Sequence, residues 1–423
     1  MKPKKLFHRD FTLMIIGQIM SLFGNSILRF ALSMYVLDKT GSAAAFGSML
    51  AVSMIPTVLL SPIGGILADR VNRRNIMVAL DFTTAGLITA FAAALRLTDN
   101  LVLIGCFMVI LSIIQSFYQP SVQASVPALT ADENLMKANG TVIQVNALAS
   151  LVGPVLGGFL YGFLGIYPIL IASIVCFFAS AVMELFLHIP FTRQARDGSL
   201  MHMAGQDIRA AFRFLSKENR QVYPLLFVIM GLNLFLSAMV TVGLPYMIKV
   251  FLGLTSQHYG FAEGCLGVGA VIGGLSAGLF AKRVQFNRSY RFLLAASLMV
   301  LPAAAAIVTN RHPLVSYGVL LVSVLCCTAG AALFNIFAQT FIQQMTPDHL
   351  IGKVMSFVSV MAVCSVPLGQ AMYGFLFDAL GSYIFVAVLF AAVASIGISL
   401  VVRHILRRLD LPEMPPLEKK AAK

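Results

Sequence analysis

Polar side chains recur at helical spacing within a long apolar segment near residues 10–37. They lie three or four positions apart, on one face of a helix, in the order Gln18, Ser21, Asn25 and Arg29. In apolar surroundings such groups cost free energy unless they face protein partners or water. The stripe therefore predicts a helix face that lines a polar cavity, in which amides, a hydroxyl and one cation could hydrogen-bond to a small molecule.

Three further apolar segments carry similar stripes. The stripes comprise Ser112, Gln115, Gln119 and Gln123 near residues 101–124, Asn233, Ser237 and Thr241 near 222–249, and Asn335, Gln339 and Gln343 near 313–342. Any one of these amides could instead join two helices by a hydrogen bond. Recurrence on four segments favours one shared cavity, and we expect it to be lined by Gln18, Asn25, Arg29, Gln115, Gln119, Asn233, Ser237, Thr241, Asn335 and Gln339.

Arg29 lies roughly 13 Å from the outer end of its segment at 1.5 Å per residue. A guanidinium near the centre of a bilayer costs about 2.5–3.5 kcal/mol. Arg29 therefore needs a partner, either an anionic group of a bound molecule or an acid or polar cluster of the protein itself.

Four carboxyls lie within apolar segments. Glu184 and Asp378 stand near segment ends, where an interfacial position is expected, and Asp81 is within two turns of an end. Glu263 lies about six residues inside its segment. Because a carboxyl removed from water can gain and lose a proton near neutral pH, Glu263 is the first proton-coupling candidate and Asp81 the second. A carboxylate at the outer rim of a helix is an equally good interpretation of Glu263.

The composition indicates which elements position these side chains. Of the 423 residues 59% are apolar and 11% are charged, whereas a soluble domain has about 25% charged residues. Twelve spans of about 20 residues use about 240 residues, close to the apolar total of about 250. These numbers exclude soluble enzymes and predict an all-α integral membrane protein. Its helices are expected near residues 10–37, 43–67, 75–96, 101–124, 137–164, 168–189, 222–249, 257–281, 290–309, 313–342, 351–378 and 382–403.

The net charge of +13 is distributed unevenly over the connections between these spans. Alternate connections, including both ends of the chain, hold 25 of the 30 Lys and Arg residues. The opposite connections hold Lys39, Arg96, Lys249 and Arg311. By the positive-inside rule, both termini lie in the cytoplasm of a multi-pass protein of the inner or plasma membrane. Topology thus explains the charge, and nucleic acid is not expected as a partner.

A polar, basic segment at 190–221 separates six spans from six others. Short motifs recur in the two halves at an offset near 213–216, as with Pro154 and Pro367, which indicates a duplicated six-helix unit. Within the segment, apolar residues at helical spacing indicate a short amphipathic helix, namely Ile208, Ala211, Phe212 and Leu215. A plain charged linker explains the segment equally well. We predict bundles over 1–189 and 222–408, the linker over 190–221, and a disordered cytoplasmic tail over 409–423.

Motifs for enzymatic chemistry do not occur. The six cysteines lie inside apolar runs without metal-ligand spacing, and the sequence has neither an HExxH motif nor a Gly-x-x-x-x-Gly-Lys-Ser/Thr nucleotide loop. No enzyme activity, metal or cofactor is therefore expected.

A Gly-x-x-x-Asp-Arg-x-x-Arg-Arg pattern between the second and third spans is formed by Gly65, Asp69, Arg70, Arg73 and Arg74. Through this motif the chain resembles the major facilitator superfamily over nearly its whole length. The resemblance implies two pseudo-symmetric six-helix bundles around a central cavity. It also implies that the motif is a conformational latch, with its aspartate docked at the start of the eleventh span, around Pro347 and Asp348.

The fifth span resembles a pattern typical of exporters in that superfamily, here formed by Gly140, Gly153, Pro154, Gly157 and Gly158. Ala149 replaces one glycine of the pattern by another small residue. Small residues permit close helix approach and proline bends the helix. The resemblance implies export rather than import.

The first span and the loop after it are similar to the branch that contains macrolide efflux proteins and enterobactin exporters, through Gly17-Gln18, Phe23-Gly24-Asn25 and Asp38-x-Thr40-Gly41-Ser42. The arginine that many drug:proton antiporters carry in the fourth helix is absent, and Gln115 and Gln119 are found there instead. A proton relay of the usual kind is therefore not expected, and Arg29 is the alternative buried cation.

Together these features predict a monomeric secondary active transporter that exports a small amphipathic molecule by alternating access. A macrolide or a siderophore-like metabolite is the expected substrate, and proton antiport the expected energy source. The alternative is an importer or uniporter of a small solute or lipid with the same fold. The expected partners are the substrate, protons and the lipid bilayer.

Overall fold

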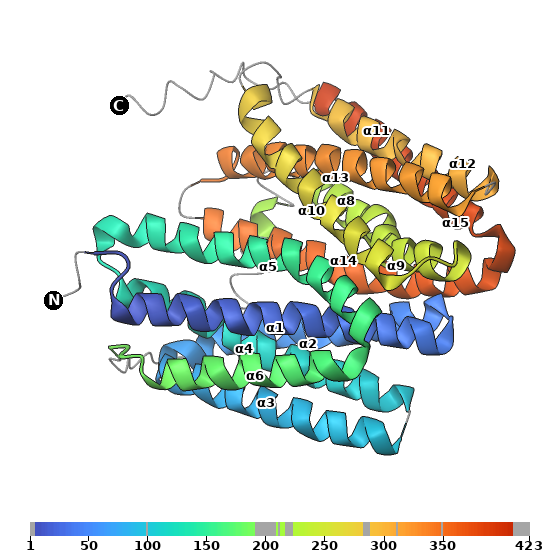
Figure 1. Cartoon of the computed structure of the whole chain (residues 1–423). Coiled ribbons are helices and arrows are strands. Elements are labelled where there is room, and N and C mark those ends of the chain that lie inside the picture. The colour runs from blue at the N-terminus through green and yellow to red at the C-terminus, as the bar shows by residue number, and fades with distance from the viewer. Residues whose placement is uncertain are drawn as a thin grey trace. The chain divides into compact units, whose positions relative to one another are not determined.

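The computed structural model of the protein describes residues 5–98, 100–190, 209, 212–215, 223–281, 288–309, 312–347 and 350–408. All regular structure in these residues is helical, and twelve helices are long and apolar enough to cross a membrane (Figure 1). The predicted fold class is confirmed. The helices are α1 (Arg9–Thr40), α2 (Ala43–Arg70), α3 (Arg73–Leu97), α4 (Leu101–Leu129), α5 (Leu135–Leu164), α6 (Ile166–Leu185), α8 (Tyr223–Leu232), α9 (Ala238–Tyr246), α10 (Ser256–Ala281), α11 (Tyr290–Leu298), α12 (Val300–Thr309), α13 (Pro313–Gln344), α14 (Ile351–Leu380) and α15 (Phe385–Arg408).

The helices form two compact units. The first unit contains α1, α2 from Met49 onward, α3 to α6, and Thr255–Phe261 at the start of α10. Within it α1 packs against α4, α5 and α6, and α3 packs against α4 and α6. One cluster of buried apolar side chains surrounds Leu28 and Phe107, and another surrounds Phe11 and Val122.

The second unit contains α8, α9, α10 from Ala262 onward, α11 to α15, and Ser42–Ser48 at the start of α2. The predicted bundles differ from these units at two helix starts: Ser42–Ser48 belongs to the second unit, and Thr255–Phe261 belongs to the first. The core of the second unit includes Phe214 and Leu215 from the predicted linker. Ile208 and Ala211, which complete the predicted amphipathic spacing, lie outside the described residues.

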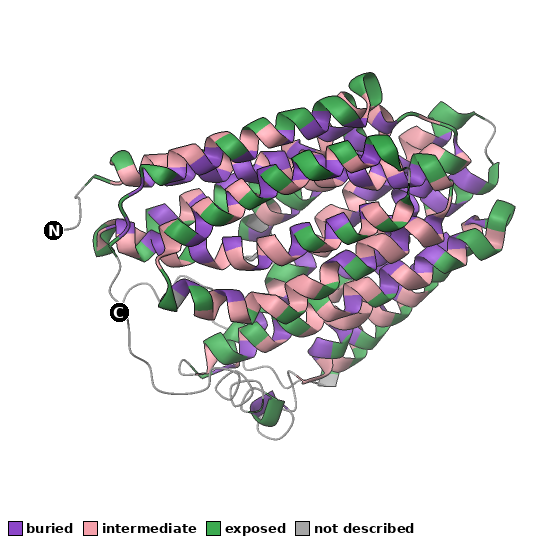
Figure 2. Ribbon diagram, turned by 90° about the horizontal axis from the view of Figure 1, so that it is seen from below, coloured by how far each residue is buried: buried purple, intermediate pink, exposed green. Residues whose placement is uncertain are grey.

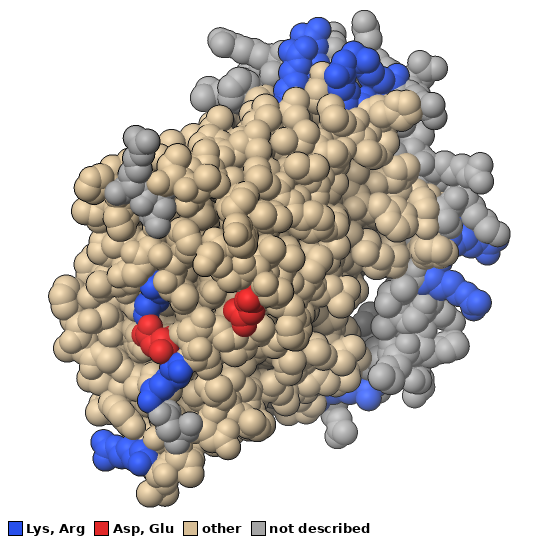
Figure 3. Space-filling model, turned by 90° about the vertical axis from the view of Figure 1, so that its right-hand side faces the viewer, with Lys and Arg blue, Asp and Glu red and all other residues tan. Residues whose placement is uncertain are grey.

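Along each helix, buried and exposed residues alternate, so that one face is buried and the opposite face is exposed (Figure 2). Many of the exposed residues are large and apolar. Leu59, Leu275 and Leu368 are 64%, 73% and 68% exposed. Such outward faces suit contact with lipid, where water is not available to solvate charges. Figure 3 looks at the ends of the helices, where acidic and basic side chains are also few.

The seventh and ninth spans are interrupted, although the sequence predicts continuous helices. In the seventh, a π-helical turn at Asn233–Ser237 joins α8 to α9 and a second one follows at Met247–Phe251. In the ninth, α11 ends just before Met299, three residues ahead of Pro302. The proline ring cannot pack against the carbonyl four residues earlier, which accounts for the break between α11 and α12.

Asp378, near the end of α14, caps the first turn of α2 within the second unit. Its carboxylate accepts hydrogen bonds from the Ser42 hydroxyl and from the backbone N–H groups of Ala43, at 2.7 Å, and Ala44, at 3.1 Å. The first N–H groups of a helix lack partners within the helix and attract negative charge. The carboxylate therefore fixes the start of α2.

We expect Asp378→Ala to destabilise the protein by about 1–2 kcal/mol, as the loss of other helix caps does. Thermal unfolding of the purified protein in detergent measures this as a lower midpoint. The matched control is Glu133→Ala, which removes an exposed carboxylate. Equal midpoints for the two variants would contradict the capping role.

Candidate functional site

The second unit contains a partly open cavity of about 450 Å³. Asn233, Ser237 and Thr241 reach it from the seventh span, and Asn335 reaches it from α13. Its remaining lining is mostly apolar, with Leu236, Val240, Leu266, Leu293 and Phe334 among the contributors. The structure thus brings together four polar residues of the predicted set, and small-molecule sites commonly combine such a volume with apolar walls and a few polar groups.

The π-helical turn Asn233–Ser237 forms part of this cavity wall. Gly369 of α14 packs directly against the turn, because a Cβ atom there would lie 2.3 Å from the Leu234 carbonyl oxygen. Single π turns within α-helices are frequent at functional sites. The sequence offers no signal for this turn beyond the polar pair that bounds it.

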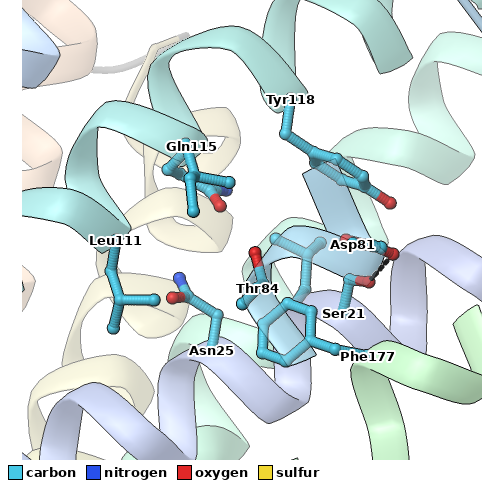
Figure 4. Close-up of a pocket in the computed structure, with 10 residues that line it drawn as sticks. Ser21, Asn25, Asp81, Thr84, Leu111, Gln115, Tyr118 and Phe177 are labelled. Carbon is cyan, nitrogen blue, oxygen red and sulfur yellow. Dashed lines mark hydrogen bonds between the residues drawn. The ribbon is translucent and has the colours of Figure 1, made fainter. Parts of the chain in front are cut away.

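The first unit holds a much smaller pocket, of about 10 Å³, shown in Figure 4. It has room for about one water molecule. Its polar lining comes from α1, α3 and α4, and the side chains drawn point toward a common space. These polar residues are Ser21, Asn25, Asp81, Thr84, Gln115 and Tyr118.

Arg29 is half-buried and makes hydrogen bonds to neutral partners. Its Nε donates to the Asn25 Oδ1 at 3.3 Å, and its Nη2 donates to the Ser112 Oγ at 2.8 Å. The guanidinium therefore joins the polar stripes of α1 and α4. Of the two partners predicted for Arg29, this arrangement provides the polar cluster of the protein itself.

The other predicted cavity residues lie elsewhere. Gln119 donates from Nε2 to the Asn146 Oδ1 of α5 at 3.2 Å, and Gln339 donates to the Asn335 Oδ1 at 3.0 Å. Gln18 is fully buried, and neither polar atom of its amide has a hydrogen-bond partner among the described residues. Asn146 was not predicted from the sequence, because it falls within the small-residue pattern of the fifth span.

The four intramembrane carboxyls differ in environment. Asp81 is 1% exposed, and Glu184 is 0% exposed, although an interfacial position was expected for it. The Tyr118 hydroxyl donates to the Glu184 Oε1 at 2.8 Å, which explains how α6 can bury the carboxyl in its last turn. Glu263 is half-buried and lines neither of the two cavities.

The predicted latch residues lie at the end of α2 and the start of α3. Arg73 donates to the Ala68 carbonyl oxygen at 3.0 Å, and Arg74 donates to the carbonyl oxygens of Glu184 and Leu185 at the end of α6. These bonds tie α2, α3 and α6 together and satisfy carbonyls that helix ends leave open. The Asp69 side chain and Asp348 lie outside the described parts, so the predicted docking of the aspartate stays a prediction.

The sequence model of a family described as Major Facilitator Superfamily matches residues 14–369. The chain belongs to the Major Facilitator Superfamily. It is therefore a transporter and not an enzyme, and the twelve membrane-length helices among its described residues make it a multi-pass protein of the cell membrane.

Known transporters are similar to this chain in sequence, and a solved structure is similar to it in fold. Macrolide efflux protein A of Streptococcus pyogenes is 25% identical over 371 residues, which cover 86% of this chain and 88% of that protein. The enterobactin exporter EntS of Citrobacter koseri is 22% identical over 87% of this chain and 85% of its own. The predicted resemblance to these transporters is confirmed. In fold the chain is similar to the nucleoside transporter NupG, with a TM-score of 0.74 and 13% identity over 95% of this chain and all of that one.

Proposed function

We propose that this major facilitator protein exports a small amphipathic organic molecule by alternating access, in exchange for protons. The cavity of the second unit is the observation that carries the proposal. Its volume of about 450 Å³ falls in the range of small-molecule sites, and its neutral amides and hydroxyls stand among apolar walls. Such a lining suits a molecule that combines apolar surface with hydrogen-bonding groups.

The similar exporters supply the substrate classes to try first, which are a macrolide and a siderophore-like metabolite. Arg29 favours a substrate that carries an acidic group. We assign the contacts with substrate to the four polar-stripe residues of the cavity in the second unit, which are Asn233, Ser237, Thr241 and Asn335.

Outward transport is supported by the glycine and proline pattern of α5, which resembles that of exporters. The excess of Lys and Arg on alternate connections supports cytoplasmic termini. Export then means that the substrate enters the protein from the side on which both termini lie. The protein acts as a monomer in this scheme, with each chain containing both six-helix units.

Proton entry supplies enough free energy for useful export. One proton moving through about 100 mV releases about 2.3 kcal/mol, and one pH unit adds about 1.4 kcal/mol. The total of about 3.7 kcal/mol supports a gradient of roughly 500-fold for a neutral substrate at one-to-one exchange.

The test is the steady-state accumulation of a radiolabelled macrolide, and separately of enterobactin, in bacteria that lack their own drug pumps. Cells that express the protein should accumulate less of at least one of the two compounds than cells with an empty vector. Asn335→Leu, which replaces a polar group of the cavity by an apolar one, should abolish that difference.

The matched control is Val322→Leu on the same helix, because Val322 is 62% exposed and does not line the cavity. It should export as the wild type does, at an equal amount of protein in the membrane fraction. Higher accumulation than in empty-vector cells would indicate import and would overturn the proposed direction.

A further inference from the structure

We propose that Asp81 and Glu184 form a proton-binding site inside the first unit, with Ser21 and Tyr118 as the hydroxyls that donate to them. The site extends the proposed proton antiport by naming the groups that load the proton. It replaces Glu263 as the first candidate, because Asp81 and Glu184 belong to one buried network.

The network contains two hydrogen bonds, each of which joins two helices. The Ser21 Oγ of α1 donates to the Asp81 Oδ2 of α3 at 2.5 Å, and the Tyr118 hydroxyl of α4 donates to the Glu184 Oε1 of α6 at 2.8 Å. Ser21, Asp81 and Tyr118 line the same pocket, so the two hydrogen-bonded pairs are neighbours. Two carboxyls and two hydroxyls thus form one buried cluster.

The surroundings do not suit two negative charges. The Glu184 Oε2 is buried and has no hydrogen-bond partner among the described residues, whereas an ionised carboxylate requires donors at both oxygens. The nearby guanidiniums serve other groups: Arg74 donates to backbone carbonyls, and Arg29 donates to Asn25 and Ser112. Two buried carboxylates in one network are costly, so the pair holds a proton in this conformation.

A route for exchange is present on one side of the pair. Asp81 and Ser21 line the pocket of about 10 Å³, which has the volume of about one water molecule and is too small for an organic substrate (Figure 4). A hydronium ion there can give its proton to the Asp81 carboxylate and remain as water.

Infrared spectroscopy of the purified protein in lipid nanodiscs tests the site without any substrate. The wild type should show the carbonyl stretch of a neutral carboxylic acid at pH 7. The double variant Asp81→Asn/Glu184→Gln should lose this band, while Asp38→Asn, which removes an exposed carboxyl at the end of α1, should retain it. A band that persists in the double variant, or is absent from the wild type, would overturn the proposal.

Tyr118→Phe keeps both carboxyls and guards against a double variant that fails to fold. Removal of the hydrogen bond to Glu184 should shift the frequency of the carboxylic acid band. An unshifted band in a folded Tyr118→Phe protein would also overturn the proposal.

Coupling is measured in inverted membrane vesicles with the macrolide as probe. For one proton per substrate, each pH unit supports about 10-fold accumulation, and Asp81→Asn should reduce this to about onefold. Exchange of labelled for unlabelled macrolide without a pH gradient should persist. Absence of macrolide transport by the wild type would count against the proposed substrate, whereas the infrared result bears on the proton site alone.

Discussion

Gly153→Val in α5 is expected to abolish efflux and to lower the thermal unfolding midpoint. A Cβ atom at position 153 would lie 2.2 Å from the Ser26 Oγ and 2.6 Å from the Ser26 Cβ. Both distances are far below contact, so α1 and α5 must separate to admit any side chain. Overpacking of this kind typically costs about 1–3 kcal/mol for small insertions, and valine exceeds a single methyl group.

Two variants make this prediction specific. Gly140→Ala lies on the same helix, but a Cβ atom there meets nothing within 4 Å, so its efflux and stability should match the wild type. Gly153→Ala adds the same Cβ atom and should also lose efflux, and Ser26→Gly, which removes both clashing atoms, should restore much of that loss in the double variant. Equal loss of efflux in Gly140→Ala and Gly153→Ala would show that the close approach of α1 and α5 is not the cause.

Arg29→Ala is expected to reduce efflux about 10- to 150-fold, the equivalent of the 1.5–3 kcal/mol that hydrogen bonds of a charged group contribute. The truncation removes the donors to Asn25 and Ser112 and detaches the polar stripe of α1 from that of α4. Transport and thermal unfolding of the purified protein should be measured together.

Ser112→Ala separates two roles of Arg29, because it removes one protein partner and leaves the guanidinium. If the guanidinium only holds α1 to α4, Ser112→Ala should reproduce part of the loss for every substrate. If it also binds substrate, Ser112→Ala should be mild, and Arg29→Ala should be most severe for acidic compounds. Wild-type efflux by Arg29→Ala would remove this residue from the substrate cavity.

The twelve spans could be predicted from the sequence because each is a long apolar run that stands out from the polar connections. The α2 and α13 helices begin at the predicted residues 43 and 313. The π turn at Asn233–Ser237 could not be predicted in this way, because it depends on the packing of Gly369 against Leu234. Periodicity along one helix carries no information about such a contact.

Some residues of the candidate site could likewise be predicted from the sequence, and others could not. The stripe spacing anticipates that Asn233, Ser237, Thr241 and Asn335 face a common space, since all four follow from helical periodicity. The burial of Glu184 is not evident from the sequence, because its position in the last turn of α6 suggests an interface. It becomes clear only when Tyr118 from α4 is seen to reach the carboxyl.

The most direct test of proton-coupled export is the internal pH of inverted membrane vesicles with an acidified lumen. The cytoplasmic face of the protein is then outside, so that exported substrate moves into the lumen and protons move out. On addition of the macrolide, a pH-sensitive dye in the lumen should report saturable alkalinisation that is absent from empty-vector vesicles. Macrolide uptake without any change in the internal pH would contradict the account and indicate a uniporter.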